Sequence, residues 1–156
     1  MRKWGDRSAK VYSEVHPTLQ HYLDRALQEV ADISLVCGHR GQVEQNEAYY
    51  AVPQRSKLQW PNGKHNSLPS TAVDFQPYPM PASEPKLWAS LAYVAGRVIE
   101  MARQDGVTIR WGGDWNSNGD LTDQTFDDLF HLELVEEPPN ETIGTSLHPS
   151  SFRLNH

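Results

Sequence analysis

Three side chains in this sequence have the donor types that a metal ion requires. His65 stands in a turn-rich segment, Asp74 enters the apolar run that follows, and His131 lies in the alternating segment LFHLELV. Two imidazoles and one carboxylate are a sufficient ligand set for a catalytic zinc ion, which keeps a fourth position open for water. Such an ion acidifies water and polarises a carbonyl, so the set predicts hydrolysis near neutral pH. The alternative is that Asp74 caps a turn and the two histidines are unrelated.

Proton transfer would need a further carboxylate, and two aspartates stand close to His131. Asp128 precedes it by three residues in DLFH and could act as general base and then protonate a leaving amine. Asp127 competes for this role, and a solvated loop end is the alternative for both. Arg40, in CGHRGQVEQ, could donate two hydrogen bonds to a carboxylate or a developing oxyanion, or could be a surface cation. Gln45 would face the same region one helical turn onward.

A second candidate ion site lies in the segment DWNSNGDLTDQT. Acidic and amide side chains occupy alternate positions before a glycine, which is the first half of a calcium-binding loop pattern. The twelfth position is Thr125, so the usual bidentate glutamate is missing, and a plain turn rich in Asp and Asn is the alternative. The candidate calcium ligands are Asp114, Asn116, Asn118, Asp120 and Asp123.

Helices and strands must position these residues, and apolar spacing predicts where they lie. The predicted helices cover 17–30, 42–52 and 84–106, and the predicted strands cover 32–38, 71–75, 107–111 and 129–135. Residues 53–71 have no period and are expected to be a loop. The longest helix has an apolar stripe formed by Trp88, Leu91, Ala95, Val98 and Ala102. The pattern predicts one α+β domain, with helices packed on a small, largely antiparallel sheet.

Composition narrows the possible partners. The chain has 156 residues and a net charge of -6, so one domain is expected, without general attraction to nucleic acid or anionic membranes. Cys37 is the single cysteine, which excludes an internal disulfide framework and a multi-cysteine zinc site. The N-terminus does not read as a signal peptide, and no segment reaches the length of a membrane span. Residues 136–156 are too polar to form a domain and are expected to be a tail.

Four motifs in this order resemble one family, the LAS-type zinc peptidases. They are VHPTLQHYLDRAL, VCGHRGQVEQNEAYY, SKLQWPNGKHNSLPSTAVDFQPYP and WGGDW with FDDLFHLEL, and together they span about residues 4–135. The family contains D-Ala-D-Ala carboxypeptidases and phage L-alanyl-D-glutamate endopeptidases. The long spacer between His65 and Asp74 leans toward the endopeptidase branch, the phage endolysins.

The resemblance implies a Hedgehog/DD-peptidase-like fold, with residues 1–135 as the catalytic domain and no separate wall-binding domain. It implies that the zinc ligands are His65, Asp74 and His131. Asp128 would be the catalytic acid and base, and Arg40 would hold substrate or the tetrahedral intermediate. Some relatives carry a regulatory calcium loop where 114–123 lies. His39 stands where many relatives have tyrosine, so it is either a pocket residue that binds substrate or a spurious extra ligand.

The expected function is therefore hydrolysis of the peptidoglycan stem peptide, between L-Ala and D-Glu, by a monomeric zinc endolysin. The resemblance implies accumulation in the host cytoplasm and access to the wall after a holin opens the inner membrane. A D-Ala-D-Ala carboxypeptidase on the same metal site is the rival enzyme. A non-catalytic peptidoglycan- or calcium-binding module is the rival from another class. A metal-dependent nuclease is less favoured because no basic stripe is evident.

Overall fold

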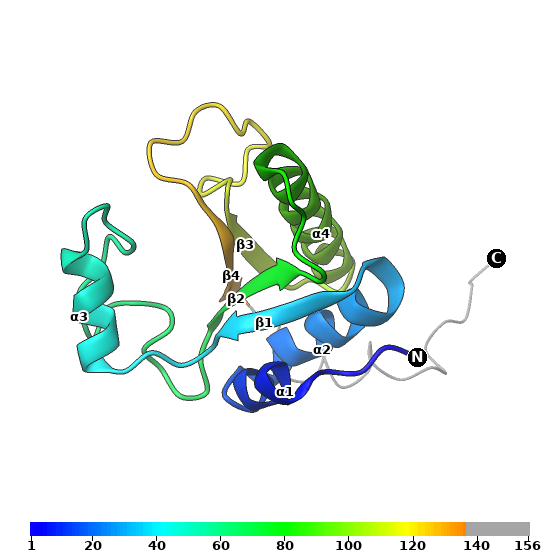
Figure 1. The fold of residues 1–156 in the computed structure, drawn as a ribbon, viewed down its shortest axis with the longest axis horizontal. Helices are drawn as coiled ribbons and strands as arrows, with labels where there is room; N and C mark the ends of the chain where they lie inside the picture. The colour runs from blue at the N-terminus through cyan, green and yellow to red at the C-terminus, as the bar shows by residue number, and fades with distance from the viewer. Residues whose placement is uncertain (137–156) are drawn as a thin grey trace.

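A four-stranded sheet and the helices around it make up most of residues 1–136, which are the residues that this computed structural model describes (Figure 1). The elements in chain order are α1 (Asp6–Ser13), α2 (Pro17–Arg25), the π-helical η1 (Ala26–Val30), β1 (Ile33–Cys37), α3 (Gln42–Tyr50), β2 (Ala72–Pro77), α4 (Glu84–Gln104), β3 (Thr108–Gly112) and β4 (Asp128–Glu136). The expected tail, 136–156, lies outside the described residues apart from Glu136, which ends β4.

The sheet is antiparallel throughout, with the strand order β1-β2-β4-β3. This confirms the α+β class and the antiparallel sheet expected from the sequence. In the register, Asp74 on β2 lies opposite His131 on β4, and Gly112 at the end of β3 lies opposite Asp128 at the start of β4. Residues that are distant in the sequence therefore meet as cross-strand neighbours.

Local signals at the helix ends explain where the two longest predicted helices begin. At α2, the His16 side chain accepts a hydrogen bond from the backbone N–H of Thr18 at 3.2 Å, and Pro17 occupies the first turn. At α4, the Ser83 hydroxyl accepts one from the backbone N–H of Lys86 at 3.3 Å. Gly106 follows α4 with a φ of 75°, a conformation that favours glycine.

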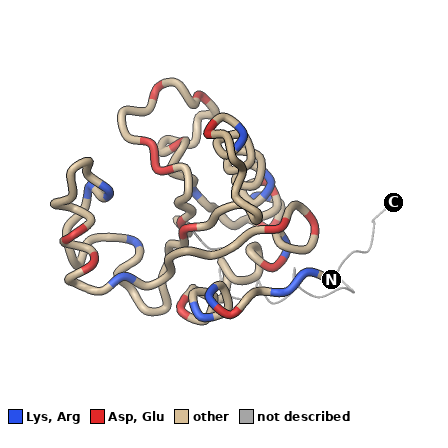
Figure 2. The backbone as a smooth tube through the Cα atoms, viewed as in Figure 1, with Lys and Arg blue, Asp and Glu red and all other residues tan. Residues whose placement is uncertain are grey.

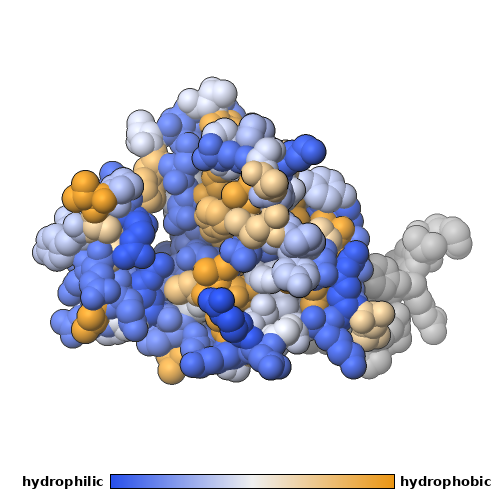
Figure 3. Space-filling model, viewed as in Figure 1, coloured by the Kyte–Doolittle hydropathy of each residue, from blue (hydrophilic) through white to orange (hydrophobic). Residues whose placement is uncertain are grey.

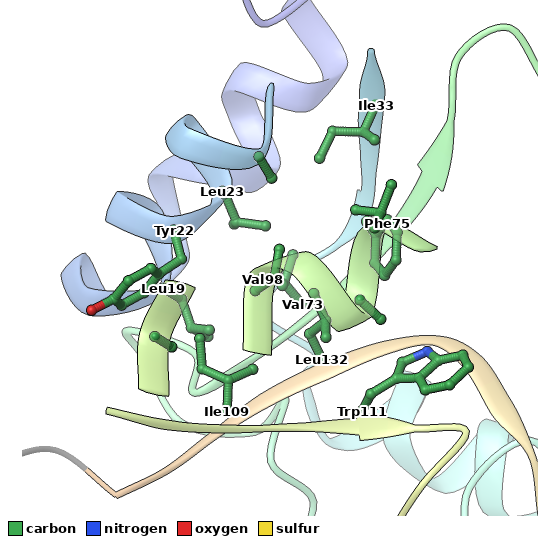
Figure 4. Close-up of a cluster of buried hydrophobic side chains, with 14 of the residues drawn as sticks. Leu19, Tyr22, Leu23, Ile33, Val73, Phe75, Val98, Ile109, Trp111 and Leu132 are labelled. Atoms are coloured by element: carbon green, nitrogen blue, oxygen red, sulfur yellow. The ribbon is translucent and has the colours of Figure 1, made fainter. Parts of the chain in front are cut away.

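The core fills the space between the sheet and helices α2 and α4 (Figure 4). Alternate strand residues point into it, and each large apolar side chain buried there contributes ~1.5–3 kcal/mol. The strand members of the core include Val73, Phe75, Ile109, Trp111, Leu132 and Leu134. The intervening residues of β2, β3 and β4 point to the opposite face. One face of the sheet thus holds the core, and the other is left for polar side chains.

Three features differ from the expectations. Helix α1 was not predicted, because it buries only Ser8 fully and therefore has no strong apolar period. Trp88 does not belong to the buried stripe of α4, since 47% of its surface is exposed, whereas the stripe from Leu91 to Ala102 is buried as expected. The apolar run of residues 32–38 predicts a buried strand, but β1 is a sheet edge and Val36 on it is 44% exposed.

The described helices include none that is long and apolar enough to cross a membrane. Residues 53–71 form no helix or strand beyond a single bridge between Val15 and Ser70, in agreement with the expected loop. Helix α3 stands away from the sheet, and this loop returns from it to β2 (Figure 1).

Candidate active site

Three atoms of the predicted ligand set converge on one point of the open sheet face. The Nε2 atom of His65 lies 3.1 Å from Nδ1 of His131 and 3.2 Å from Oδ1 of Asp74, and the last two atoms are 3.4 Å apart. Both histidines are buried, with 4% and 6% of their surface exposed. Asp74 and His131 meet as a strand pair, whereas His65 reaches them from the 53–71 loop.

The loop delivers His65 because it is fixed to the end of β1. The Gly38 carbonyl accepts from the Nδ1–H of His65 at 2.7 Å and from the Ser70 hydroxyl at 3.0 Å. The backbone N–H of Arg40 donates to the His65 carbonyl at 2.8 Å. Because a carbonyl only accepts, Nδ1 of His65 carries the proton, and Nε2 presents a lone pair to the cluster.

A buried carboxylate orients His131 in the same way. Nε2 of His131 donates to Oε1 of Glu133 at 3.0 Å, and the other oxygen of Glu133 pairs with Arg110 at 2.8 Å. Burial opposes ionisation of Glu133, but His131 and Arg110 hold the pKa of its carboxyl below the ordinary value. Nδ1 of His131 is thereby left with its lone pair toward His65 and Asp74. This carboxylate–histidine arrangement commonly supports a metal-ligating imidazole.

The residues present fit a zinc ion. Oδ1 of Asp74 is buried and receives no well-directed hydrogen bond from the described residues. Two imidazole lone pairs and this oxygen face one another with no donor between them, which costs free energy unless a cation or a proton sits there. Two nitrogens and one oxygen on three side chains are a ligand set of catalytic zinc sites.

The charges of the cluster change one another's protonation. Burial favours a neutral Asp74, yet His65 and His131 hold the pKa of its carboxyl far below the ordinary value. Burial likewise opposes protonation of His65, but the Asp74 carboxylate outweighs it and raises the pKa of His65 to about 10, so Nε2 of His65 takes up a proton whenever no cation is bound there. The pKa of Asp128 is raised, first by burial and then by the negative charge of Asp74. A carboxyl with a raised pKa suits a group that must both take and return a proton.

Asp128 lies beside the cluster at the start of β4, with one carboxylate oxygen 4.0 Å from Nδ1 of His131. The neighbouring Asp127 is exposed and forms no ion pair with a described residue. Strand β3 approaches so closely that a Cβ atom at Gly112 would overlap the backbone carbonyl of Asp128. Glycine at 112 therefore fixes where Asp128 stands.

Arg40 and Gln45 also reach the site. Nη2 of Arg40 lies 3.7 Å from Oδ2 of Asp74, and Nη1 donates to the Gln45 side chain at 3.2 Å. Gln45 is 1% exposed and is also hydrogen-bonded to Asn66 and Ser56, so its side chain is fixed and holds the Arg40 guanidinium in place.

These residues line a cleft of about 490 Å³ between the sheet, the α3 side and the 112–127 loop (Figure 3). On the α3 side its wall carries the exposed cations Arg55, Lys57 and Lys64, and Lys57 lies 5.1 Å from the ring centroid of Phe126 on the opposite wall. Figure 2 shows both basic and acidic positions on the α3 side and acidic positions along the 112–127 loop. The exposed cations Arg55, Lys57 and Lys64 on the cleft wall suit an elongated ligand that carries negative charge.

Comparison with known proteins agrees with this chemistry. A family model described as phage L-alanyl-D-glutamate peptidase matches residues 1–135. The L-alanyl-D-glutamate peptidase of Escherichia phage T5 is 33% identical over 147 residues, which cover 85% of this chain and 98% of that protein. The chain belongs to the phage L-alanyl-D-glutamate peptidase family. This confirms the resemblance drawn from the four motifs.

A solved structure resembles the peptidase in fold as well. The Serratia marcescens L-Ala D-Glu endopeptidase ChiX superposes with a TM-score of 0.59 and 27% sequence identity, covering 83% of this chain and 87% of that one. The α+β fold is thus shared with an endopeptidase of known structure.

Two other groups of predicted residues lie apart from the cluster of His65, Asp74 and His131. His39 is not among the residues that line the cleft, and its ring bonds the Ser67 carbonyl at 3.1 Å. The candidate calcium residues lie in the exposed 112–127 loop, where Asp123 accepts from the amides of Asn116 and Asn118. Asp114 accepts from the backbone N–H groups of Asn118 and Gly119.

Sequence reasoning missed four residues that shape the active site. Glu133 has a readable signal, because His131 and Glu133 are two apart in a strand and must share a face. Trp115 stacks on Phe126 and lies 5.5 Å from the His131 ring, and Arg110 pairs with Glu133. Cys37 lies with Sγ 3.8 Å from Nδ1 of His65. The last three contacts depend on tertiary structure and have no local pattern.

Proposed function

We propose that this peptidase is a zinc enzyme that hydrolyses the L-Ala–D-Glu bond of peptidoglycan stem peptides. The observation that carries the proposal is the convergence of three lone-pair atoms, from His65, Asp74 and His131, within 3.4 Å of one another. When bound, zinc supplies Lewis-acid chemistry that polarises the scissile carbonyl and acidifies the attacking water. The choice of the L-Ala–D-Glu bond rests on the description of the family and on the name of the structural relative.

Asp128 is the proton carrier of the proposed reaction. Its carboxylate takes the proton from the water that forms the new C–O bond, and returns it to the D-Glu nitrogen as the C–N bond breaks. The second proton of the water passes from the new carboxyl group to the amine, so the products are an L-Ala carboxylate and a D-Glu ammonium group. The position of Asp128, 4.0 Å from His131 and partly buried, supports this role.

Arg40 stabilises the negative charge that develops on the carbonyl oxygen. Its guanidinium lies at the edge of the ligand cluster, 3.7 Å from Asp74, and Gln45 holds its other nitrogen at 3.2 Å. A pre-oriented donor of this kind acts without reorganisation at the moment of reaction.

Product analysis tests the proposal. Purified peptidoglycan is digested by the protein, with and without EDTA, and the fragments are identified by mass spectrometry. We expect a new D-Glu amino terminus, its loss with EDTA, its return with zinc, and one equivalent of zinc in the purified protein. Release of free D-Ala instead would assign the carboxypeptidase activity. Undiminished cleavage by His131→Ala, or an active protein without bound metal, would refute the zinc site.

We also propose a weak calcium site in the 112–127 loop. The five candidate oxygens and the left-handed backbone of Ser117 and Gly119, with φ of 55° and 80°, support it. Without a glutamate at the twelfth position, a Kd weaker than the ~10⁻⁷–10⁻⁵ M of sensor loops is expected. Calorimetric titration measures it, with Asp114→Ala as the variant that should lose binding. Equal heats for the wild type and this variant would dismiss the site.

We propose further that the protein works as a monomer and reaches the wall from the host cytoplasm after a holin-type opening of the inner membrane. Light scattering coupled to size exclusion checks the first point. Expression with and without a co-expressed holin checks the second: lysis should require the holin, and lysis without it would contradict the proposal.

A further inference from the structure

A second cavity adjoins the active site on the far side of Asp128. It has a volume of about 630 Å³ and lies between the first turns of α4 and the end of the 112–127 loop. Its walls include Trp88, Trp111, Leu121 and Phe130, and we call it the aromatic groove. Asp128 lines both the cleft and the groove, so the two cavities lie on either side of this carboxylate.

Two members of the groove are exposed although they are apolar. Trp88 is 47% exposed and Leu121 is 50% exposed. Figure 3 shows apolar side chains gathered on the surface of this face of the molecule. Apolar surface that stays open inside a cavity indicates a ligand site rather than unfinished packing.

Charge distinguishes the groove from the cleft. The cleft wall carries Arg55, Lys57 and Lys64, whereas the residues lining the groove include no lysine or arginine, and their charged members are acidic. A ligand that spans both must be anionic on the cleft side and uncharged on the groove side. The groove would repel a carboxylate.

The proposed substrate has this polarity. After the L-Ala–D-Glu bond the stem peptide carries carboxylates, beginning with that of D-Glu. Before it, the L-Ala nitrogen is acylated by the lactyl group of N-acetylmuramic acid, so the chain continues into an uncharged N-acylated sugar. The sugar lies about two residue lengths, ~7 Å, from the scissile carbonyl. It would therefore stand next to Asp128, where the groove begins.

We propose that the aromatic groove binds the muramyl sugar of the glycan strand, with Trp88 as the stacking surface. This inference rests on the proposed L-Ala–D-Glu specificity. An indole face carries negative electrostatic potential and attracts the polarised C–H groups on the flat side of a sugar ring. The groove thus selects a stem peptide that is still attached to glycan and sets the direction in which it lies.

Kinetics with two matched substrates test the proposal. One is the disaccharide-linked stem peptide, and the other is the same peptide with an N-acetyl group in place of the lactyl sugar. We expect wild-type kcat/KM to be about tenfold higher on the sugar-linked substrate. Trp88→Ala should bring the ratio of the two values to about one, and Trp88→Phe should keep part of it. Tyr93→Ala, an exposed aromatic change on α4 outside the groove, is the control and should keep the wild-type ratio.

A ratio near one in the wild type, or a Trp88→Ala variant that loses both activities equally and keeps the ratio, would overturn the inference. A binding measurement separates this failure from failure of the proposed function. N-acetylmuramoyl-L-alanine should shift the Trp88 indole resonance in an NMR titration, assigned with Trp88→Phe, whereas N-acetyl-L-alanine should not. If the resonance shifts but neither substrate is cut, sugar binding by the groove is supported and the proposed bond specificity is refuted. If it does not shift, the groove proposal falls.

Discussion

His131 uses its two ring nitrogens for different purposes, and its neighbours are arranged around that division. Nε2 donates to Glu133, so Nδ1 faces Asp74 and His65. Glu133 is 3% exposed and is itself held by Arg110. Arg110, Glu133 and His131 thus form a chain that ends at the proposed metal position. If His131 is a ligand, its orientation depends on a carboxylate that does not itself bind the ion.

Glu133→Gln tests this dependence. The amide is neutral and no longer holds the Nε2–H of His131 as strongly, so zinc affinity should fall about 10–100-fold. Competition with a chromophoric chelator measures the change. Glu100→Gln, on an exposed residue paired with Arg103, is the control and should bind zinc as the wild type does. Unchanged affinity in Glu133→Gln would show that His131 needs no such support.

Asp128→Asn separates catalysis from metal binding. Loss of the proton carrier should lower kcat by ~10²–10⁴-fold, while the zinc content stays at that of the wild type. Steady-state assays with metal analysis of the same samples provide both values. Asp127→Asn decides between the two aspartates, and its kcat should remain close to that of the wild type because Asp127 is exposed. A larger fall in kcat in Asp127→Asn than in Asp128→Asn would show that Asp127 is the proton carrier.

At the scale of elements, the end of β3 and the start of β4 are held together by close backbone packing. Gly112→Ala places a methyl group against the Asp128 carbonyl. We expect a loss of ~1–3 kcal/mol in unfolding free energy and a fall in kcat of about 10²-fold as Asp128 shifts. Gly96→Ala is the control, because a Cβ there meets nothing within 4 Å, and it should be neutral or stabilising. Full activity in Gly112→Ala would contradict the packing argument.

Asp24 of α2 joins α1 and the residue segment before it to α2, next to a hydrogen bond from the Gln20 side chain to the Tyr12 carbonyl. Asp24 accepts from the Trp4 indole at 2.9 Å and from the Tyr12 hydroxyl at 2.7 Å. Burial, and then the bond to Asp24, raise the pKa of Tyr12 from 10.0 to about 12. The unfolded chain thus loses this proton first, so the stability linked to it is complete below pH 10.0 and is lost as the pH rises to about 12.

Denaturant titrations at neutral and alkaline pH check this linkage. Tyr12→Phe should cost ~0.5–1.5 kcal/mol at pH 7 through the lost hydrogen bond. The difference in unfolding free energy between the wild type and Tyr12→Phe should shrink as the pH rises from 10.0 to about 12. Tyr78→Phe, 62% exposed, is the control. A difference that stays constant with pH would show that Tyr12 does not contribute to the alkaline loss.

For the whole molecule, the local charge of the cleft opposes the net charge of -6. Arg55 and Lys64 are exposed on the cleft wall, and no ion pair joins them to another described residue. They should attract the carboxylates of the stem peptide at low ionic strength. The double variant Arg55→Gln, Lys64→Gln should raise KM about three- to tenfold, with a smaller dependence of KM on salt. The control is the double variant Lys10→Gln, Arg103→Gln, which removes two cations outside the cleft and should leave KM unchanged. An equal rise in KM in the control would show that the attraction depends on net charge alone.

Periodicity predicted the fold class, and the four family motifs predicted that the two histidines, Asp74 and Asp128 lie together, as the structure shows. That three of them bind zinc and the fourth carries a proton stays a prediction. Periodicity and motifs succeeded because Leu91 and Val98 repeat at helical spacing and because four motifs act together as a family signature. They failed at α1, whose attachment depends on a distant Asp24, and at Trp88, which has helical spacing but lies past the end of the core. Hydrophobic character shows that a residue can be buried; only the tertiary structure shows whether anything covers it.

The pairing of Gly112 with Asp128 has an evolutionary consequence. Because the two ends of segment 113–127 are already joined by the strand pair, another segment could replace most of it without moving the proposed ligands Asp74 on β2 and His131 on β4. Each doubling of its length would cost only ~0.6 kcal/mol in closure entropy. Trp115 and Phe126 belong to this segment and stack on each other, so the exchangeable part is the stretch between them. Related lysins could diversify their ion requirements and wall preferences there while the hydrolytic apparatus is inherited unchanged.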